Sequence, residues 1–320
     1  VKQKYGDYAF WCATGGGGFY SSRVVEQLAF SLGACNQISP GACQCYMPRV
    51  ACADFTYGGG WTGNQSIADH SNNEPFNEFS PKIQVLVEWG AQPSTSQTAE
   101  SGRGVADLRA IRHVKTIVVD PFMTPDAAKA DIWLPVRPGY DTALLLSWIR
   151  YIMENKLYDE DFCKYWTDLP FLLDPDTKLP LKAEDVFPGY VNPAIDPNDV
   201  YDTPAYVCFD EITNSVQPFP YTAPEDSPVN PTICKTATVN GRECKTAGQV
   251  YWEEAEPWTL QKAEEVCWVP ADRNEAAIKM YTSAEYAGLA GGVFSDMQNV
   301  SSQVPFGTIA IEMMMGHVNK

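Results

Sequence analysis

The stretch KTIVVDPFMTPDAAKADIWLPVRPGYDTALLLSW, residues 115–148, contains two apolar runs that each end near a carboxylate. The first run ends at Asp120 and Pro121, and the second ends in a turn that leads to Asp141. Residues 142–154 then place leucine, isoleucine and tryptophan side chains at helical spacing. Short apolar runs that alternate with helices predict a parallel sheet with right-handed crossovers.

The same alternation continues on both sides of this stretch. Apolar runs predict further strands at residues 7–14, 83–89 and 287–294. Helical spacing predicts further helices at residues 21–32, 104–113, 275–281 and 306–316. Residues 169–249 differ because they are rich in Pro and Asp, and we expect loops and short hairpins there. The chain is therefore predicted to be an α/β protein with a mostly parallel sheet.

Composition and charge narrow the class of protein. The chain has 320 residues, of which 45% are hydrophobic, and its formal net charge is −17. Residues 151–320 hold 27 acidic and 11 basic side chains, against 13 and 12 in residues 1–150. An acidic chain repels phosphate backbones, so nucleic acid is not expected as a partner. No apolar run is long enough for a membrane span, so none is expected in this chain.

The ten cysteines do not have the spacing of a zinc site. No CxxC pair occurs, and His70, His113 and His317 lie far from any cysteine pair in the sequence. Most of the thiols are expected to be buried and inert. A reducing or anaerobic setting would tolerate them, and disulfides of a secreted protein stay open as the alternative.

A run of four glycines, Gly15 to Gly18, follows the first apolar run. It does not match the GxGxxG fingerprint, because Tyr20 and Ser21 stand where the third glycine is required. Binding of NAD is therefore disfavoured. The run is either a loop that cradles another ligand or a surface turn.

Asp120 and Asp141 are the strongest candidates for a binding site. A carboxylate at the end of a buried strand costs stability unless it meets hydrogen-bond donors. The hydroxyls of a ribose and the N–H edge of a guanine are such donors, and open α/β sheets bind nucleotides at their strand ends. The alternatives are an Asp-Pro turn at Asp120 and a plain helix N-cap at Asp141.

Several motifs resemble those of one enzyme family. VVDPFMTPDAAKADIWLPVRPGYD is similar to a signature of the molybdopterin oxidoreductases of the dimethyl sulfoxide reductase type. IQVLVEWGAQPSTS, ENKLYDEDFCKYWTD and GGVFSDMQNVSSQVPFGTIAIEMMMGHVNK also resemble segments of that family and follow its order. The likeness covers most of residues 5–165 and 285–320. The excursion at about 170–255 resembles that of anaerobic members that act on phenols, such as transhydroxylases and catechol dehydroxylases.

The resemblance implies a fold and a domain plan. It predicts a mostly parallel nucleotide-binding-type sheet domain nested within a second α/β domain. Residues 1–45 and 285–320 would form the outer domain, and residues 46–284 the inner one with its loop-rich insertion. Both ends of the chain break off inside predicted elements, so we expect the central fragment of a catalytic subunit that is inactive alone.

The resemblance also implies cofactors and partners. Such enzymes use a bis(molybdopterin guanine dinucleotide) cofactor with molybdenum or tungsten. An iron–sulfur cluster is expected in an N-terminal part outside this chain, and an iron–sulfur subunit is expected as the electron-transfer partner. A small molecule is expected as substrate. A prokaryotic anaerobe is the expected source, while the compartment, periplasmic or cytoplasmic, stays open.

A protein ligand to the metal is implied within CNQISPGACQCYMPRV, residues 35–50. The pattern resembles the one that places the ligand on Ser39, and a hard alkoxide suits a high-valent oxophilic metal. Cys45 and Cys43 are rivals, because thiolates fill this role in other family members. A simple turn at Ser39, with no protein ligand, is the remaining alternative.

The family's cofactor contacts map onto the other motifs. Asp120 resembles the residue that binds a guanosine ribose, and Asp141 the residue that binds guanine. The remaining implied cofactor-binding positions are Gly16, Gly17, Trp89, Gly90, Pro93, Pro121, Thr124, Gly139 and Gln303. Gln298 and Asn299 could line the metal pocket as catalytic residues, or could cap a helix.

Three positions depart from the family's usual pattern. Gln92, Phe122 and Tyr140 stand where an Asn, an Arg and a Thr are common. The predicted function is metal-centred transfer of oxygen, hydroxyl or two electrons. A non-redox hydratase or transhydroxylase of the same family is the nearest alternative, and a metal-free α/β solute-binding module is the alternative from another class.

Overall fold

The computed structural model describes residues 1–13, 19–34, 36–38, 47–57, 83–96, 102–192, 204–220 and 224–317. The strands are β1 (Trp11–Ala13), β2 (Asn36–Ile38), β3 (Val85–Trp89), β4 (Lys115–Val119), β5 (Ile132–Leu134), β6 (Leu172–Leu173), β7 (Tyr206–Asp210), β8 (Ser215–Phe219), β9 (Thr236–Val239), β10 (Arg242–Thr246) and β11 (Ala287–Gly291). The α-helices are α1 (Lys2–Tyr5), α2 (Phe19–Ser31), α4 (Met47–Tyr57), α5 (Pro93–Ser96), α6 (Arg103–Ala110), α7 (Asp141–Glu154), α8 (Glu160–Tyr165), α9 (Ala183–Val186), α10 (Ala247–Ala255), α11 (Leu260–Cys267), α12 (Ala271–Thr282), α13 (Val293–Asp296) and α14 (Gln303–Met314). Short 3-10 turns lie at η1 (Asp7–Ala9), η3 (Ala127–Lys129) and η4 (Pro224–Asp226).

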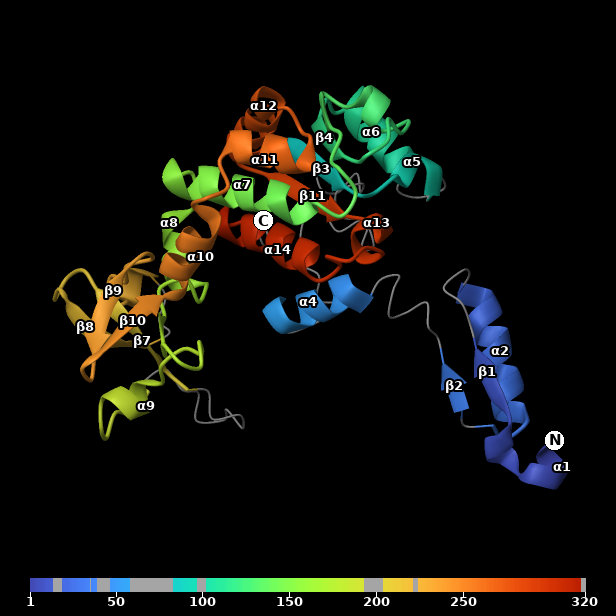
Figure 1. Ribbon diagram of the computed structural model, residues 1–320, viewed down its shortest axis with the longest axis horizontal. Helices are drawn as coiled ribbons and strands as arrows, with labels where there is room; N and C mark the ends of the chain where they lie inside the picture. The colour runs from blue at the N-terminus through green and yellow to red at the C-terminus, as the bar shows by residue number, and fades with distance from the viewer. Residues whose placement is uncertain are drawn as a thin grey trace.

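A four-stranded parallel sheet in the order β11-β3-β4-β5 organises the main body. Helices cover both of its faces, as Figure 1 shows. The predicted α/β class and the mostly parallel sheet are confirmed. Because the chain adds β4 and β5 on one side of β3 and returns to place β11 on the other, the direction of strand addition reverses at β3. Ligands of open α/β sheets bind outside the carboxyl ends of strands at such a reversal.

Alternate residues of β3 belong to two different cores. Val85, Val87 and Trp89 join the large cluster formed with α7, α11, α12 and α14. Leu86 joins the smaller cluster with Val105 and Leu108 of α6. Successive side chains of a strand point to opposite faces, so a strand that is buried on both faces reads as a continuous apolar run.

The described part of the segment predicted as loops and short hairpins forms two antiparallel units. β7 and β8 make a hairpin, and β6, β10 and β9 form a three-stranded sheet. These strands have a core of their own, which includes Leu172, Val207 and Val239. In Figure 1 this part lies beyond α8 and α10, to one side of the central sheet.

The N-terminal residues form a small separate group. β1 and β2 pair in parallel, and Ala29 of α2 packs with Cys12 and Ala34. Figure 1 draws this group away from the central sheet. The nested domain plan stays a prediction, but β11 pairs with β3, so residues 287–291 share the sheet of the predicted inner domain.

The cysteines that the structure describes are all free thiols. Six of these seven are buried and Cys234 is exposed, which agrees with the expected inert role. Burial raises the pKa of Cys163 and of Cys208 to about 12. A search of the described helices found none that is both long and apolar enough to cross a membrane.

Candidate cofactor-binding site

The carboxyl edge of the central sheet gathers the principal predicted residues. Trp89 ends β3, Asp120 follows β4, and Asp141 is the first residue of α7 after β5. The carboxyl ends of parallel strands lie at one edge, so residues distant in the sequence meet there. The Trp89 indole Nε1 donates a 2.8 Å hydrogen bond to Asp141 Oδ1. The negative charge of Asp120 also raises the pKa of Asp141, as expected for neighbouring carboxylates.

Asp141 is buried without a cation among its described partners. Its exposed fraction is 1%, and hydrogen bonds from the side chains of Trp89 and Gln298 lower the pKa of its carboxyl. Burial raises the pKa of this carboxyl, and the hydrogen bond from Trp89 offsets part of that rise. The plain N-cap alternative is wrong, because Tyr140 is the N-cap of α7 and no side chain caps the helix. The carboxylate accepts the hydrogen bond from Trp89 instead.

Asp120 combines the two roles considered for it. Its Oδ1 atom accepts a 2.9 Å hydrogen bond from the backbone N–H of Phe122, so an Asp-Pro turn does form. The residue is nevertheless only 3% exposed, and burial raises the pKa of its carboxyl. The side chain of Gln92, which stands where the family commonly has Asn, donates to the same carboxylate and lowers its pKa. Asp120 therefore belongs to the site as well as to the turn.

Gly139 connects the site to the segment after β11. Its backbone has a φ of +81°, which favours glycine, and its N–H donates a 3.0 Å hydrogen bond to Gln298 Oε1. A Cβ atom at Gly139 would lie 2.9 Å from Asn299 Oδ1. Gln298 and Asn299 thus approach the turn before α7 and do not cap α14, whose N-cap is Ser302. The Nε2 atom of Gln298 is buried, and hydrogen bonding from this side chain lowers the pKa of Asp141.

The other predicted positions have local partners. Gln303 Oε1 accepts a 3.0 Å hydrogen bond from the Thr142 hydroxyl, which joins the first turns of α14 and α7. Thr124 Oγ1 accepts from the N–H of Ala127 and closes the turn at η3. Pro93 begins α5, three residues after the buried Gly90. Pro121 follows Asp120 in the turn. Whether these residues touch a cofactor stays a prediction.

Some of the predicted residues cannot be placed. Gly16, Gly17, Ser39, Cys43 and Cys45 lie outside the residues that the structure describes. Within the described ranges, no group of three or more His, Cys, Asp or Glu side chains is arranged to hold a metal ion. The choice between Ser39 and Cys45 as metal ligand therefore stays open.

The sequence reasoning missed a buried ion cluster on the other face of β3. Arg109 of α6 pairs with Glu88 at 3.1 Å and with Asp126 at 3.0 Å. Asp126 also accepts hydrogen bonds from the backbone N–H and the hydroxyl of Ser94. The cluster fixes the segment after Gly90 against the sheet. A glutamate within the apolar run VLVEW was its only sequence signal.

A second missed contact fixes the start of α4 near the end of β11. Arg49 Nε lies 2.7 Å from Asp296 Oδ2, and the Arg49 guanidinium donates to the carbonyl of Gly291. The Asp296 side chain is fully buried, and burial raises the pKa of this carboxyl to about 6 although Arg49 lowers it. Arg49 lies within the motif from which a metal ligand was predicted.

The site residues can be tested for their fit to a guanine nucleotide. Asp141 has a buried carboxylate, and the Gln298 side chain beside it lowers the pKa of that carboxyl by hydrogen bonding. The edge of a guanine base carries both N–H donors and an acceptor oxygen. A buried carboxylate without a cation among its described partners, next to an amide, offers groups of the kind that such an edge can meet.

Comparisons with known proteins give an independent view. No family model matches the chain. The dopamine dehydroxylase of Eggerthella lenta is 42% identical over 99 residues, which is 31% of this chain and 10% of that protein. A putative catalytic chain of a dimethyl sulfoxide reductase from Halobacterium salinarum is 38% identical over 93 residues, which is 29% of this chain and 11% of that protein. The chain is related to the dimethyl sulfoxide reductase family of molybdenum enzymes.

A solved structure supports the same fold. The acetylene hydratase of Pelobacter acetylenicus superposes with a TM-score of 0.53 and 18% identity, over 99% of this chain and 30% of that protein. At this identity the likeness concerns the fold. The sequence matches span about a tenth of the curated relatives. The predicted relationship to the molybdopterin oxidoreductases is confirmed at the level of the family.

Proposed function

We propose that this chain forms a guanine-nucleotide-binding part of a molybdopterin-dependent oxidoreductase that uses bis(molybdopterin guanine dinucleotide) with molybdenum or tungsten. One observation carries the proposal. The buried Asp141 carboxylate is held by hydrogen bonds from Trp89 and from the Gln298 amide, and no cation is found among its described partners. A charged group in this state loses hydration without full compensation. A nucleotide with N–H donors would supply what is missing.

The roles of the individual residues follow from their positions. Asp141 Oδ2 would accept hydrogen bonds from the guanine N–H edge, and Trp89 would hold the carboxylate in the required orientation. Asp120 would accept from a ribose hydroxyl next to the turn that it closes. Gly139 would leave room for the base, because Gln298 and Asn299 already occupy its other side.

The proposed reaction class rests on the relatives. When bound, the molybdopterin cofactor would supply the redox chemistry through which oxygen, hydroxyl or two electrons are exchanged with a small substrate. The similarity to a dopamine dehydroxylase supports a phenolic substrate. The same proposal includes an iron–sulfur cluster, an electron-transfer partner chain, and inactivity of these 320 residues alone.

The decisive variant is Asp141→Asn, which keeps the acceptor for Trp89 and removes the charge. We expect bound molybdenum or tungsten, and guanine nucleotide released by acid, to fall by about tenfold or more, because a hydrogen bond to a charged group contributes roughly 1.5–3 kcal/mol. The folding stability of the cofactor-free protein should stay the same or rise, because ionising the buried carboxylate opposes folding.

Asp131→Asn is the matched control. This exposed carboxylate pairs with Lys115 at 2.7 Å, away from the carboxyl edge, and its loss should leave the metal content unchanged. Full metal and nucleotide content in the Asp141→Asn protein would contradict the proposal. Wild-type protein that never carries metal or guanine nucleotide would favour the solute-binding module. A bound metal that keeps its oxidation state during turnover would favour the non-redox hydratase or transhydroxylase.

A further inference from the structure

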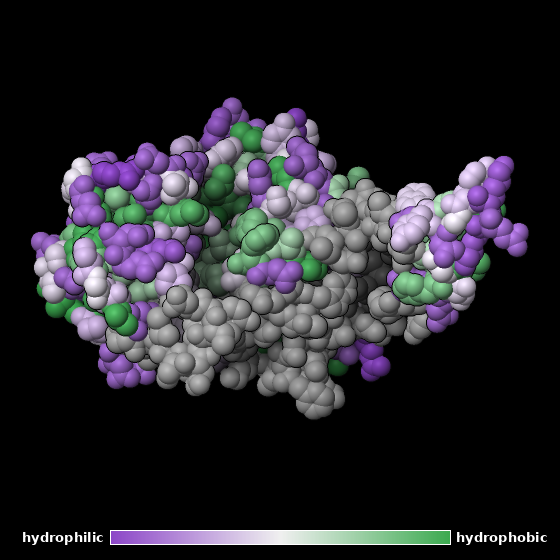
Figure 2. All heavy atoms as spheres, turned by 90° about the horizontal axis from the view of Figure 1, so that it is seen from below, coloured by the Kyte–Doolittle hydropathy of each residue, from purple (hydrophilic) through white to green (hydrophobic). Residues whose placement is uncertain are grey.

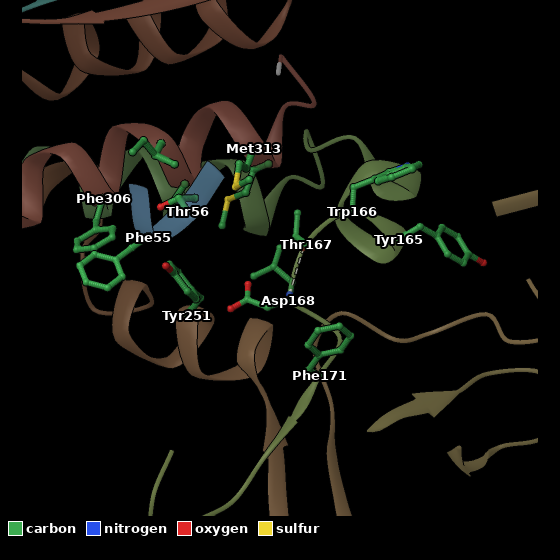
Figure 3. Close-up of a pocket in the computed structure, with 14 residues that line it drawn as sticks. Phe55, Thr56, Tyr165, Trp166, Thr167, Asp168, Phe171, Tyr251, Phe306 and Met313 are labelled. Carbon is green, nitrogen blue, oxygen red and sulfur yellow. Dashed lines mark hydrogen bonds between the residues drawn. The ribbon is translucent and has the colours of Figure 1, made fainter. Parts of the chain in front are cut away.

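A cavity of about 610 Å³ lies between α4, α8, α10 and α14. Its size falls in the range of pockets that bind small molecules. Figure 3 shows residues that line it, and Figure 2 shows a hollow bordered by hydrophobic side chains on this face of the molecule. None of the residues placed at the candidate cofactor site lines this cavity. It is therefore a separate candidate site.

Aromatic residues from four parts of the chain line the cavity. They are Phe55, Tyr165, Trp166, Phe171, Tyr251 and Phe306. In Figure 3 the rings of Phe55, Phe306 and Tyr251 lie on the side that Asp168 faces, whereas those of Tyr165 and Trp166 point away. Phe55 is 86% exposed, so the cavity opens to the surface. Large aromatic groups gathered at an open cavity are typical of a binding surface. Their ring faces carry negative electrostatic potential, which attracts a cation.

Asp168 is the one charged side chain among the described residues that line the cavity. No Lys, Arg or His side chain faces it there, so its charge is not neutralised within the lining. Figure 3 shows its carboxylate and the Tyr251 ring projecting into the space between α14, α4 and α10. A small molecule can reach Asp168, while the surrounding protein raises the pKa of its carboxyl by desolvation. The charge of Asp168 in turn contributes to the raised pKa of Tyr251.

These features select one chemical class of ligand. An anion would meet both a carboxylate and the negative faces of aromatic rings, and would be repelled. A neutral apolar ligand would leave the partly desolvated carboxylate without a partner. An organic cation would pair with Asp168 and place its body against the rings. The ion pair and the contacts with the rings would then both favour binding.

We propose that this cavity binds an organic ammonium compound, with the ammonium group beside Asp168 and an aromatic or alkyl body against Phe55, Tyr251 and Phe306. The proposal does not depend on a cofactor at the sheet edge. The two sites share α14, whose first residue Gln303 contacts Thr142 near the sheet edge, whereas Phe306 and Met313 line the cavity.

The test compares two probes that share a ring and differ in charge. Binding of phenethylamine and of phenethyl alcohol to the purified protein is measured by calorimetry. We expect the amine to bind at least about tenfold more tightly, because the ion pair and the cation–π contacts are available only to the cation. Asp168→Asn should remove that preference, and Asp168→Glu should restore most of it.

Asp176→Asn is the matched control, because this exposed carboxylate pairs with Arg242 and lies outside the cavity. It should leave both affinities unchanged. Thermal unfolding of each variant shows that it remains folded, and metal content should not change in Asp168→Asn, which separates this site from the proposed cofactor site. Equal affinity for the two probes, no binding of the amine, or an undiminished preference in folded Asp168→Asn would each overturn the proposal.

Discussion

Glu88 and Trp89 are neighbours on β3, yet they lead to two different polar sites at the same edge of the sheet. On one face, Glu88 meets Arg109, which also pairs with Asp126. On the other face, Trp89 meets Asp141, for which no cation is found among the described hydrogen-bond and ion-pair partners. Both carboxylates are almost fully buried, with exposed fractions of 0% for Glu88 and 1% for Asp141.

The difference lies in what neutralises the charge. The Glu88 face contains its own cation, and its ion pairs fix Ser94 and the segment that follows Gly90. The Asp141 face has no cation among the described partners, and its carboxylate meets only the hydrogen bonds of Trp89 and of the Gln298 amide. A buried charge without a cation is costly unless a ligand completes its hydrogen bonds. We therefore propose structural support for the first face and ligand binding for the second.

Arg109→Met should have the largest effect, because it removes the cation shared by Glu88 and Asp126. Loss of one partner from a buried ion pair costs about 3–5 kcal/mol. We expect a decrease of that size in the free energy of unfolding, measured with urea. Arg103→Met on the same helix is the control, because Arg103 is 82% exposed and its ion pair with Asp107 contributes little. A loss below about 1 kcal/mol for Arg109→Met would show that the cluster is not structural.

Glu88→Gln should change the dependence of stability on pH. Burial raises the pKa of Glu88 from 4.5 to about 8 in the folded protein, although Arg109 lowers it. The folded state therefore binds this proton more tightly, so the stabilisation is complete below about pH 4.5 and is lost as the pH rises through 8. We expect the variant to match the wild type near pH 5 and to be more stable by roughly 4 kcal/mol near pH 9, because the shift spans about 3.5 pH units at about 1.4 kcal/mol each.

Thermal or urea unfolding at these two pH values checks the Glu88→Gln prediction. The exposed Glu253, which pairs with Lys245, provides the control variant Glu253→Gln. Because this control carries no buried charge, its curve should follow that of the wild type at alkaline pH. An equal pH dependence in Glu88→Gln and wild type would mean that Glu88 does not titrate between the two values.

Trp89→Phe should have the smallest effect on folding and a selective effect on the other face. It keeps most of the ring packing with Trp148, whose centroid lies 5.9 Å away, and removes the hydrogen bond to Asp141. We expect a loss of roughly 1–2 kcal/mol in stability. The amount of bound cofactor should fall more, in relative terms, than the free energy of unfolding, because the Asp141 carboxylate loses the contact that orients it. Full metal content in this variant would show that Trp89 does not contribute to the proposed nucleotide site.

The periodicity of the sequence was sufficient to predict most of the sheet and the location of its carboxylates. Apolar runs at β3, β4 and β5 were visible because strands buried on both faces leave no polar alternation. Asp120 and Asp141 stood out because each follows such a run. The N-cap interpretation of Asp141 failed because capping depends on side-chain direction, which spacing does not encode.

Contacts between distant segments could not be predicted in the same way. Gln298 reaches Gly139 only because β11 returns to pair with β3. Arg109 meets Glu88 because α6 packs over the opposite face of that strand. Both contacts join residues that are far apart in the sequence, and local sequence patterns carry no information about such contacts.

The sequence by itself determined that this protein has a parallel α/β sheet, that acidic residues stand at its carboxyl edge, and that its motifs resemble those of molybdopterin enzymes. Only the tertiary structure decided which buried carboxylate has a cation and which has only uncharged hydrogen-bond partners among the described residues. The physical reason is that strand and helix periods are local properties of the chain, whereas the neutralisation of a buried charge depends on which distant segment packs against it.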